Sequence, residues 1–382
     1  MTTTSPTPIA ERLIADHFAP NYAQARAKFM DAAQRAGATV RSYELPGHVG
    51  AQGEVLATDV AYVGPENAES LIILSSGVHG LEGLCGSGCQ IAALTDSDLL
   101  GRLRTSSQGF LVIHGVNPYG FSHLRRTNED NVDINRNFID FANPPQNEGY
   151  AEVHDLLVPE VWPPSPDNVA AISNYIEANG STKFRHAATS GQGTHPDGLF
   201  YAGTGASWSQ KTLREIIRRQ ATNCKRIAWL DVHTGLGAYG QCEKINAGPV
   251  GSHENLALAR GVWGADVFAP WEGNSVSAQA RGNTITTAYS EVPQATTVGV
   301  GLEFGTRDPF ALTPLRGASW LIRHGNKCSD AQKREIEQHM VDAFFVDNDE
   351  WKGMVWGQCR TALIQAQLAF AKFNTPAAGA QQ

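Results

Sequence analysis

Residues 75–83 read SSGVHGLEG and follow the apolar run 71–74, LIIL. The run predicts a short buried strand, and the small residues after it predict a turn that opens a helix. His79 and Glu82 stand three positions apart in that turn, a spacing that brings two side chains to the same side. An imidazole nitrogen and a carboxylate oxygen both bind zinc at about 2.0–2.2 Å. The stretch therefore predicts a strand that ends in two metal ligands, and we interpret its small residues as space for the ion and a substrate.

Composition and charge narrow the class of protein. Of the 382 residues, 42% are hydrophobic and 18% are charged, which is typical of a globular protein. The formal net charge of −8 argues against a nucleic acid or an anionic membrane as partner. No apolar run approaches the roughly 18 residues that span a bilayer, and the N-terminal residues lack the basic and apolar regions of a signal peptide. We therefore expect a cytoplasmic protein.

Strands alternate with helices along the chain, which predicts an α/β fold with a mostly parallel sheet covered on both faces. We expect strands at 40–45, 54–63, 71–75, 110–116, 226–233 and 298–304, and helices at 23–36, 83–94, 167–178, 207–220, 255–268, 309–323, 330–346 and 350–373. Residues 117–120, NPYG, predict a turn. Residues 9–373 should form a single domain with a proline- and glycine-rich insertion at about 140–205, and residues 1–8 and 377–382 should be disordered tails.

Further polar residues follow other strands of the predicted sheet. Since the ligand crevice of an open α/β sheet lies beyond the carboxyl ends of its strands, we expect these groups to converge. His233 is the natural third ligand, because two histidines, a glutamate and a water form a catalytic zinc set. Asp231 or Asp133 could accept the second N–H of a ligand histidine and fix its tautomer. We favour Asp133 for His79, and a salt bridge from Asp133 to an arginine is the alternative.

Glu303 lies in an apolar predicted strand, where an unpaired charge is costly to bury. A general base that activates water at a metal would explain it, and an ion pair with an arginine such as Arg307 is the alternative. Arg125, Arg126 and Arg136 form the arginine concentration near this predicted site. A guanidinium can hold a substrate carboxylate through two hydrogen bonds or stabilise the oxyanion of an amide under attack.

The ordered set of motifs resembles the zinc carboxypeptidase (M14-type) superfamily, and most closely its DUF2817 branch. The resemblance rests on one ordered list: His79-x-x-Glu82, NPYG at 117–120, Arg125, DINRNF at 133–138, His233 and Glu303. It implies a central mixed sheet of eight strands flanked by helices, with one Zn²⁺ bound by the two histidines and Glu82. The superfamily's active-site tyrosine has no clear counterpart, and Tyr289 is our candidate.

The resemblance also implies roles for the remaining residues of the set. Glu303 would activate the water, and Arg125 would polarise the scissile carbonyl. Asn135 and Arg136 would grip the substrate's terminal carboxylate, and Asp133 would orient the first histidine ligand. The predicted function is hydrolysis of an amide bond next to a free carboxylate, with a peptide or an N-acyl amino acid as substrate.

Two alternatives remain open beside this carboxypeptidase-type function. The first is a zinc-dependent deacylase of N-acyl amino acids, of the aspartoacylase or succinylglutamate desuccinylase kind. The second is a non-catalytic binding protein that keeps zinc as a structural ion, although a closed structural site needs no base such as Glu303. The sequence does not determine the oligomeric state.

Overall fold

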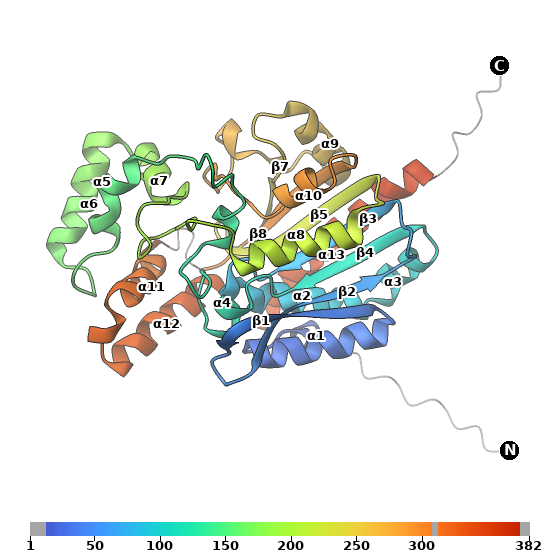
Figure 1. The fold of residues 1–382 in the computed structure, drawn as a ribbon, viewed down its shortest axis with the longest axis horizontal. Helices are drawn as coiled ribbons and strands as arrows, with labels where there is room; N and C mark the ends of the chain where they lie inside the picture. The colour runs from blue at the N-terminus through green and yellow to red at the C-terminus, as the bar shows by residue number, and fades with distance from the viewer. Residues whose placement is uncertain (1–12, 308–311, 375–382) are drawn as a thin grey trace.

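The computed structural model describes residues 13–307 and 312–374 (Figure 1). The expected tails, 1–8 and 377–382, lie outside the described residues. Within the described part, eight strands form one sheet in the order β1-β2-β4-β3-β5-β8-β6-β7. The strands are β1 Thr39–Val49, β2 Val55–Val63, β3 Ser70–Ser76, β4 Gln108–His114, β5 Arg226–Gly235, β6 Cys242–Asn246, β7 Val267–Phe268 and β8 Thr296–Gly305.

The sheet is mixed, as predicted. The central strands β4, β3, β5 and β8 run parallel, whereas β1 and β2 on one side and β6 on the other pair antiparallel. The short strands β6 and β7 were not predicted, and the helix expected over 255–268 ends before β7. β6 has five residues and β7, the edge strand, has two, so both are too short to give a clear alternation in the sequence.

Helices cover the two faces of this sheet (Figure 1). The α-helices are α1 Tyr22–Ala36, α2 Gly83–Thr95, α3 Ser97–Arg104, α4 Pro118–Ser122, α5 Gly149–Leu157, α6 Pro166–Asn179, α7 Ser181–Thr189, α8 Trp208–Ala221, α9 His253–Trp263, α10 Thr286–Glu291, α11 Leu312–His324, α12 Asp330–Phe344 and α13 Asp349–Asn374. The 3₁₀ helices are η1 Ile14–His17, η2 Gly80–Glu82, η3 Ile134–Arg136, η4 Pro270–Glu272 and η5 Gly325–Lys327.

Alternate residues of the central strands enter two separate cores. Ile72 and Leu74 of β3 pack with α1, α2 and α13, whereas Leu71 and Ile73 pack with α8 and α10. This follows from the two-residue period of a strand and explains why β3 is buried at every position and apolar from Leu71 to Leu74. Burial on both faces fixes the register of the central strands, and therefore the positions of the residues at their ends.

Two stretches for which no helix was predicted contain one. The proline-rich region 140–166 includes α5, and residues 181–189 form α7. The predicted turn at 117–120 is the start of α4, because the side chain of Asn117 accepts a hydrogen bond from Gly120 N–H and Pro118 occupies the first helical position. In Figure 1, α5, α6 and α7 lie with α11 and α12 at one end of the molecule. Arg316 of α11 links the two groups by donating hydrogen bonds to the carbonyls of Leu156 and Leu157.

Candidate metal centre

Three neighbouring parallel strands end at the same edge of the sheet. Ser75 of β3 is the register partner of Asp231 of β5, and His233 of β5 is the register partner of Glu303 of β8. The turn η2 begins directly after β3 and holds Glu82, with His79 at its N-terminal boundary. The parallel register therefore brings together side chains that are more than 150 residues apart in the sequence, as the strand-end argument predicted.

His79, Glu82 and His233 form one buried cluster. One potential ligand atom from each lies within 4.8 Å of the other two. The Nδ1 atom of His79 is 2.9 Å from Glu82 Oε1 and 3.2 Å from His233 Nδ1, and the His233 Nδ1 atom is 3.0 Å from Glu82 Oε2. Burial disfavours the charged form of Glu82, but the charge of His79 and hydrogen bonds with both imidazoles hold its pKa well below the usual range. The cluster thus presents an ionised carboxylate and two Nδ1 atoms to a common point.

The other nitrogen of His233 faces a carboxylate. His233 Nε2 lies 2.8 Å from Asp231 Oδ2, and Asp231 also accepts hydrogen bonds from Ser75 Oγ and Thr284 Oγ1. Ser75 in turn accepts from the indole N–H of Trp229. Burial opposes protonation of His233, yet the charge and hydrogen bond of Asp231 outweigh it and raise the pKa of the imidazole. Asp231 therefore orients His233, a role that the same-face spacing of 231 and 233 on a strand had left open.

The corresponding nitrogen of His79 meets two groups. His79 Nε2 lies 3.4 Å from Asp133 Oδ1, in agreement with the predicted pair, and 2.7 Å from the guanidinium of Arg126. Arg126 also donates to Asp133 through Nε at 3.0 Å and approaches Glu82 at 3.5 Å. Burial alone would raise the pKa of Asp133, but the charges of Arg126 and His79 lower it well below its usual value. Asp133 is thus ionised and lies near both His79 and Arg126. The pairing with the histidine and the salt bridge to an arginine, which the sequence left as alternatives, occur together.

Arg126, and not Arg125, is the arginine at the cluster. The guanidinium of Arg125 lies over the ring of Tyr119, at 5.9 Å from its centroid. The backbone explains the difference, since Gly80 N–H donates to the carbonyl of Arg126 and Leu81 N–H donates to that of Arg125. These backbone hydrogen bonds hold both residues beside η2, and their side chains point in different directions. Arg125 was the arginine expected near the scissile carbonyl, but it is the Arg126 guanidinium that contacts the cluster, a difference that adjacent identical residues conceal in the sequence.

Glu303 is buried beside the cluster without an arginine partner among the hydrogen bonds and ion pairs of the described residues. Its Oε1 atom accepts a hydrogen bond from Leu236 N–H at 3.0 Å. Burial and repulsion from Glu82 raise its pKa to about 7, although the charge of His233 and the Leu236 N–H act in the opposite direction. A carboxyl group with this pKa can accept a proton near neutral pH and release it again. The predicted ion pair with Arg307 is not what holds Glu303.

Asn135 and Arg136 lie beside the cluster in η3, next to Asp133. Asn135 Oδ1 accepts a hydrogen bond from Thr284 N–H, and Arg136 donates to the carbonyls of Thr189 and Asn135 through its three nitrogens. Burial lowers the pKa of Arg136 to about 10, against the opposing charge of Asp133. Three of the five guanidinium N–H groups are therefore engaged with the protein, and two remain for a ligand.

Two expectations about the surroundings of the site are wrong. The glycines of residues 75–83 were interpreted as space for a ligand, but a Cβ at Gly80 would lie 2.0 Å from the carbonyl carbon of Gly120. A Cβ at Gly83 would lie 2.6 Å from the ring of Phe121. The absence of a side chain at these two positions therefore lets α4 pack closely against them. Tyr289, the candidate active-site tyrosine, bonds through its hydroxyl to Asn255 of α9 and packs with the core under α10. It contributes to the fold and does not touch the cluster.

The donor set fits a zinc ion. Two imidazoles and one carboxylate are a known set of protein ligands for catalytic zinc, and the buried cluster can exchange its internal hydrogen bonds for bonds to a cation. A metal-bound histidine usually donates its second N–H to a carboxylate, and Asp133 and Asp231 stand at those positions. The described residues contain no other group of three histidine, cysteine or acidic side chains arranged in this way.

The chain belongs to the DUF2817 family, which is described as a protein family of unknown function and whose profile matches residues 18–358. This confirms the branch that the motifs suggested. A search of curated proteins finds no match.

Solved structures similar to this chain include carboxypeptidases. One is carboxypeptidase A from Helicoverpa armigera, with 14% identity over 85% of this chain and 73% of that one, and a TM-score of 0.43. Others are a metallo-carboxypeptidase from Burkholderia cenocepacia (14% identity, 94% and 71% coverage, TM-score 0.42) and bovine thrombin-activatable fibrinolysis inhibitor (15%, 86% and 97%, 0.42). No helix in the described part of the chain is long and apolar enough to cross a membrane.

Proposed function

We propose that this protein is a zinc-dependent hydrolase that cleaves an amide bond next to a free carboxylate. The observation that carries the proposal is the pairing of a three-ligand cluster with a buried carboxyl group whose pKa is raised to about 7. A purely structural zinc site would have no use for such a group, because it has four protein ligands and no open position. His79, Glu82 and His233 would hold the ion, which would supply Lewis acidity toward water and the carbonyl oxygen.

The chain's own side chains supply the proton transfers and the charge stabilisation. Glu303 would take a proton from the attacking water and later donate it to the leaving amine, because it is buried beside the cluster and held there by the Leu236 N–H. Arg126 is the nearest guanidinium to the cluster and would donate hydrogen bonds to the oxyanion as it develops. Asp231 would hold His233 in the tautomer whose Nδ1 atom faces the ion. Asp133, at 3.4 Å from His79 Nε2, would do the same for His79 once that nitrogen donates to it and no longer accepts from Arg126.

The substrate's carboxylate would be bound by Asn135 and Arg136. Arg136 keeps two N–H groups in a buried site of lowered dielectric, where a charge-assisted bond is stronger than in water. Its bonds to the Thr189 carbonyl fix the guanidinium in place before a ligand arrives. This preorganisation supports recognition of an anionic group beside the scissile amide.

Metal analysis with two matched variants tests the proposal. Purified wild-type protein should contain about one zinc per chain, His79→Ala should contain almost none, and Glu303→Gln should retain zinc yet lose nearly all turnover. Assays with free-carboxylate peptides and with N-acyl amino acids would separate the carboxypeptidase type from the deacylase type. A wild-type protein without metal, or a Glu303→Gln variant with full turnover, would contradict the proposed chemistry.

A further inference from the structure

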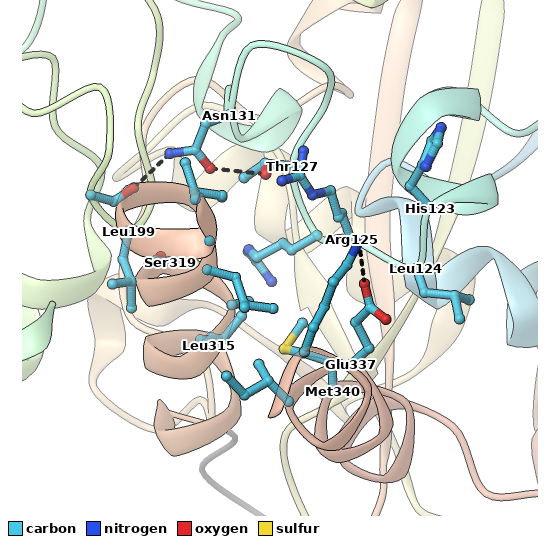
Figure 2. A pocket seen from close by; sticks show the side chains of 18 of the residues that line it. His123, Leu124, Arg125, Thr127, Asn131, Leu199, Leu315, Ser319, Glu337 and Met340 are labelled. Carbon is cyan, nitrogen blue, oxygen red and sulfur yellow. Dashed lines mark hydrogen bonds and ion pairs between the residues drawn. The ribbon is translucent and has the colours of Figure 1, made fainter. Parts of the chain in front are cut away.

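A cavity of about 310 Å³ lies between the loop that carries the two arginines and the C-terminal helices. The loop segment 119–131 forms one wall, residues 198–200 form a second, and α11 and α12 close the opposite side. Figure 2 shows the cavity from close by, with Thr127 of the loop at the top and Glu337 and Met340 of α12 below. No residue of the metal cluster lines it, so a ligand in this cavity would be held by a second set of side chains.

The wall of the cavity carries more positive than negative charge. Among the described residues that line it, Arg125, Arg126 and Lys333 are cations and Glu337 is the one acid, although the whole chain has a formal net charge of −8. The Oε1 atom of Glu337 lies 3.8 Å from Lys333 Nζ on the same helix, and Glu337 forms no other ion pair with the described residues. The two arginines are therefore not neutralised by Glu337, and a concave wall of this sign attracts anions.

The guanidinium of Arg125 has hydrogen-bonding capacity that the protein does not use. Its side chain forms no hydrogen bond and no ion pair with the described residues, and it lies over the ring of Tyr119. Its neighbour Arg126, by contrast, donates to Asp133 and contacts His79. Because Arg125 is partly buried, its N–H groups lose some of their water, which costs free energy unless an acceptor takes its place.

The other polar groups of the wall divide into paired and unpaired ones. Thr127 donates to Asn131, which itself donates to two backbone carbonyls. The hydroxyl of Ser319 has no hydrogen-bond partner among the described residues, although Ser319 is only 6% exposed. Lys333 Nζ has only the long contact with Glu337. The unused groups thus include a guanidinium, an ammonium and a hydroxyl, all of which can donate to an anion.

We propose that this cavity binds a small molecule through a carboxylate or phosphate group, with Arg125 as the anchor and Lys333 and Ser319 as further donors. A planar guanidinium binds either group through two parallel hydrogen bonds. At about 30 Å³ for each water-sized portion of space, the cavity holds about ten non-hydrogen atoms. The site goes beyond the proposed hydrolysis and does not depend on it, because binding can be measured without turnover.

Arg126 connects this anion site with the metal cluster. It lines the cavity, and its guanidinium contacts His79 and Asp133. The bound anion could therefore belong to the substrate itself or to a separate molecule whose charge acts on Arg126. Both sources present the same chemistry to Arg125, and kinetic measurements distinguish them.

NMR titration of the zinc-loaded protein with benzoate, and with benzamide as its uncharged counterpart of nearly the same shape, tests the site. We expect benzoate to bind with a Kd of about 1 mM and benzamide to bind at least about tenfold more weakly. Arg125→Met should weaken benzoate binding by about tenfold or more, because it removes a charge-assisted pair. Lys333→Met, at an exposed position, should weaken it about threefold, and Glu337→Gln should strengthen it by removing the acid from the wall.

Arg41→Met is the matched control. Arg41 also lies over a tyrosine ring, that of Tyr43 at 5.0 Å, but it lines no part of the cavity. Zinc content and thermal unfolding show that each variant is folded, and the exposed Lys333→Met decides if Arg125→Met is not. Equal binding of benzoate and benzamide, unchanged benzoate binding in the folded variants, or no saturable binding of either benzoate or inorganic phosphate would overturn the site.

Inhibition kinetics then separates the two sources of the anion. If the anion is part of the substrate, benzoate should raise KM and leave kcat unchanged. If it belongs to a separate molecule, benzoate should change kcat through Arg126 without competing with the substrate. Either effect supports the site provided that Arg125→Met removes it, and an effect that persists in Arg125→Met overturns the link to this cavity. If no substrate is hydrolysed, the proposed function fails while the binding measurements still decide the anion site.

Discussion

Replacing Glu303 by glutamine should stabilise the metal-free protein above neutral pH while it removes the general base. The folded chain raises the pKa of this carboxyl group from its ordinary value of 4.5 to about 7, chiefly through burial. Below about pH 4.5 the group is protonated in both the folded and the unfolded chain, and it costs nothing. As the pH rises toward 7 the unfolded chain loses the proton first, so stability falls across this window.

The size of this loss of stability follows from the shift in pKa, since one pKa unit corresponds to about 1.4 kcal/mol. The ionised Glu303 should cost about 3 kcal/mol at pH 8 and only about 1 kcal/mol at pH 5. Glutamine has nearly the same shape, carries no charge, and keeps an oxygen that can accept the hydrogen bond from Leu236 N–H. The variant should therefore gain about 3 kcal/mol at pH 8 and much less at pH 5.

Urea unfolding with a chelator present, at pH 5 and pH 8, measures both gains. Glu243→Gln is the matched control, because Glu243 of β6 is the register partner of Glu303 and its carboxylate accepts hydrogen bonds from Ser275 and Val276. The control should gain nothing at either pH, since Glu243 is only half-buried and its carboxylate already accepts hydrogen bonds through both oxygens, one of which glutamine lacks. A Glu303→Gln variant that is no more stable at pH 8, or equally stabilised at both pH values, would refute the reasoning about Glu303.

Three further predictions concern the surroundings of the cluster. Asp231→Asn should weaken zinc binding by about 10–100-fold, because His233 loses the carboxylate that orients it, and metal competition with a chelator measures the change. Arg126→Gln should lower kcat/KM by about 10²–10³-fold with little change in zinc content, and Arg125→Gln should lower it far less; equal losses would contradict the assignment. Zinc at about 100 times its Kd should raise the free energy of unfolding of the wild type by about 2.7 kcal/mol, as measured by urea unfolding. If zinc raised the free energy of unfolding of the His79→Ala variant equally, the ion would bind outside the cluster.

The local pattern of the sequence was sufficient for the central elements and for the three residues of the cluster. Apolar runs that end in polar residues predicted β3, β5 and β8, and the parallel register then brings His79, Glu82 and His233 together. The signal is strong because a strand buried on both faces must be apolar along its whole length, so a histidine or glutamate at its end stands out. The short strands β6 and β7 and the helices α5 and α7 lacked such a signal.

Arg126 shows what the sequence alone could not decide. Arg125 and Arg126 are identical neighbours, and only the hydrogen bonds of their backbone to η2 determine which guanidinium reaches the cluster. The sequence also did not show why Gly80 and Gly83 are glycines. They pack against α4, which lies about 40 residues further along the chain. Side-chain direction in a loop depends on partners that are distant in sequence, and no local periodicity records it.

The sequence by itself indicated the class of fold, the three residues of the cluster and the buried glutamate, because polar residues at or just after the ends of apolar strands stand out. The tertiary structure decided the arginine at the cluster, the partner of each histidine and the cavity beside them. These depend on where α4, α11 and α12 pack against the sheet and its loops. Such packing is set by the combined shape of many side chains.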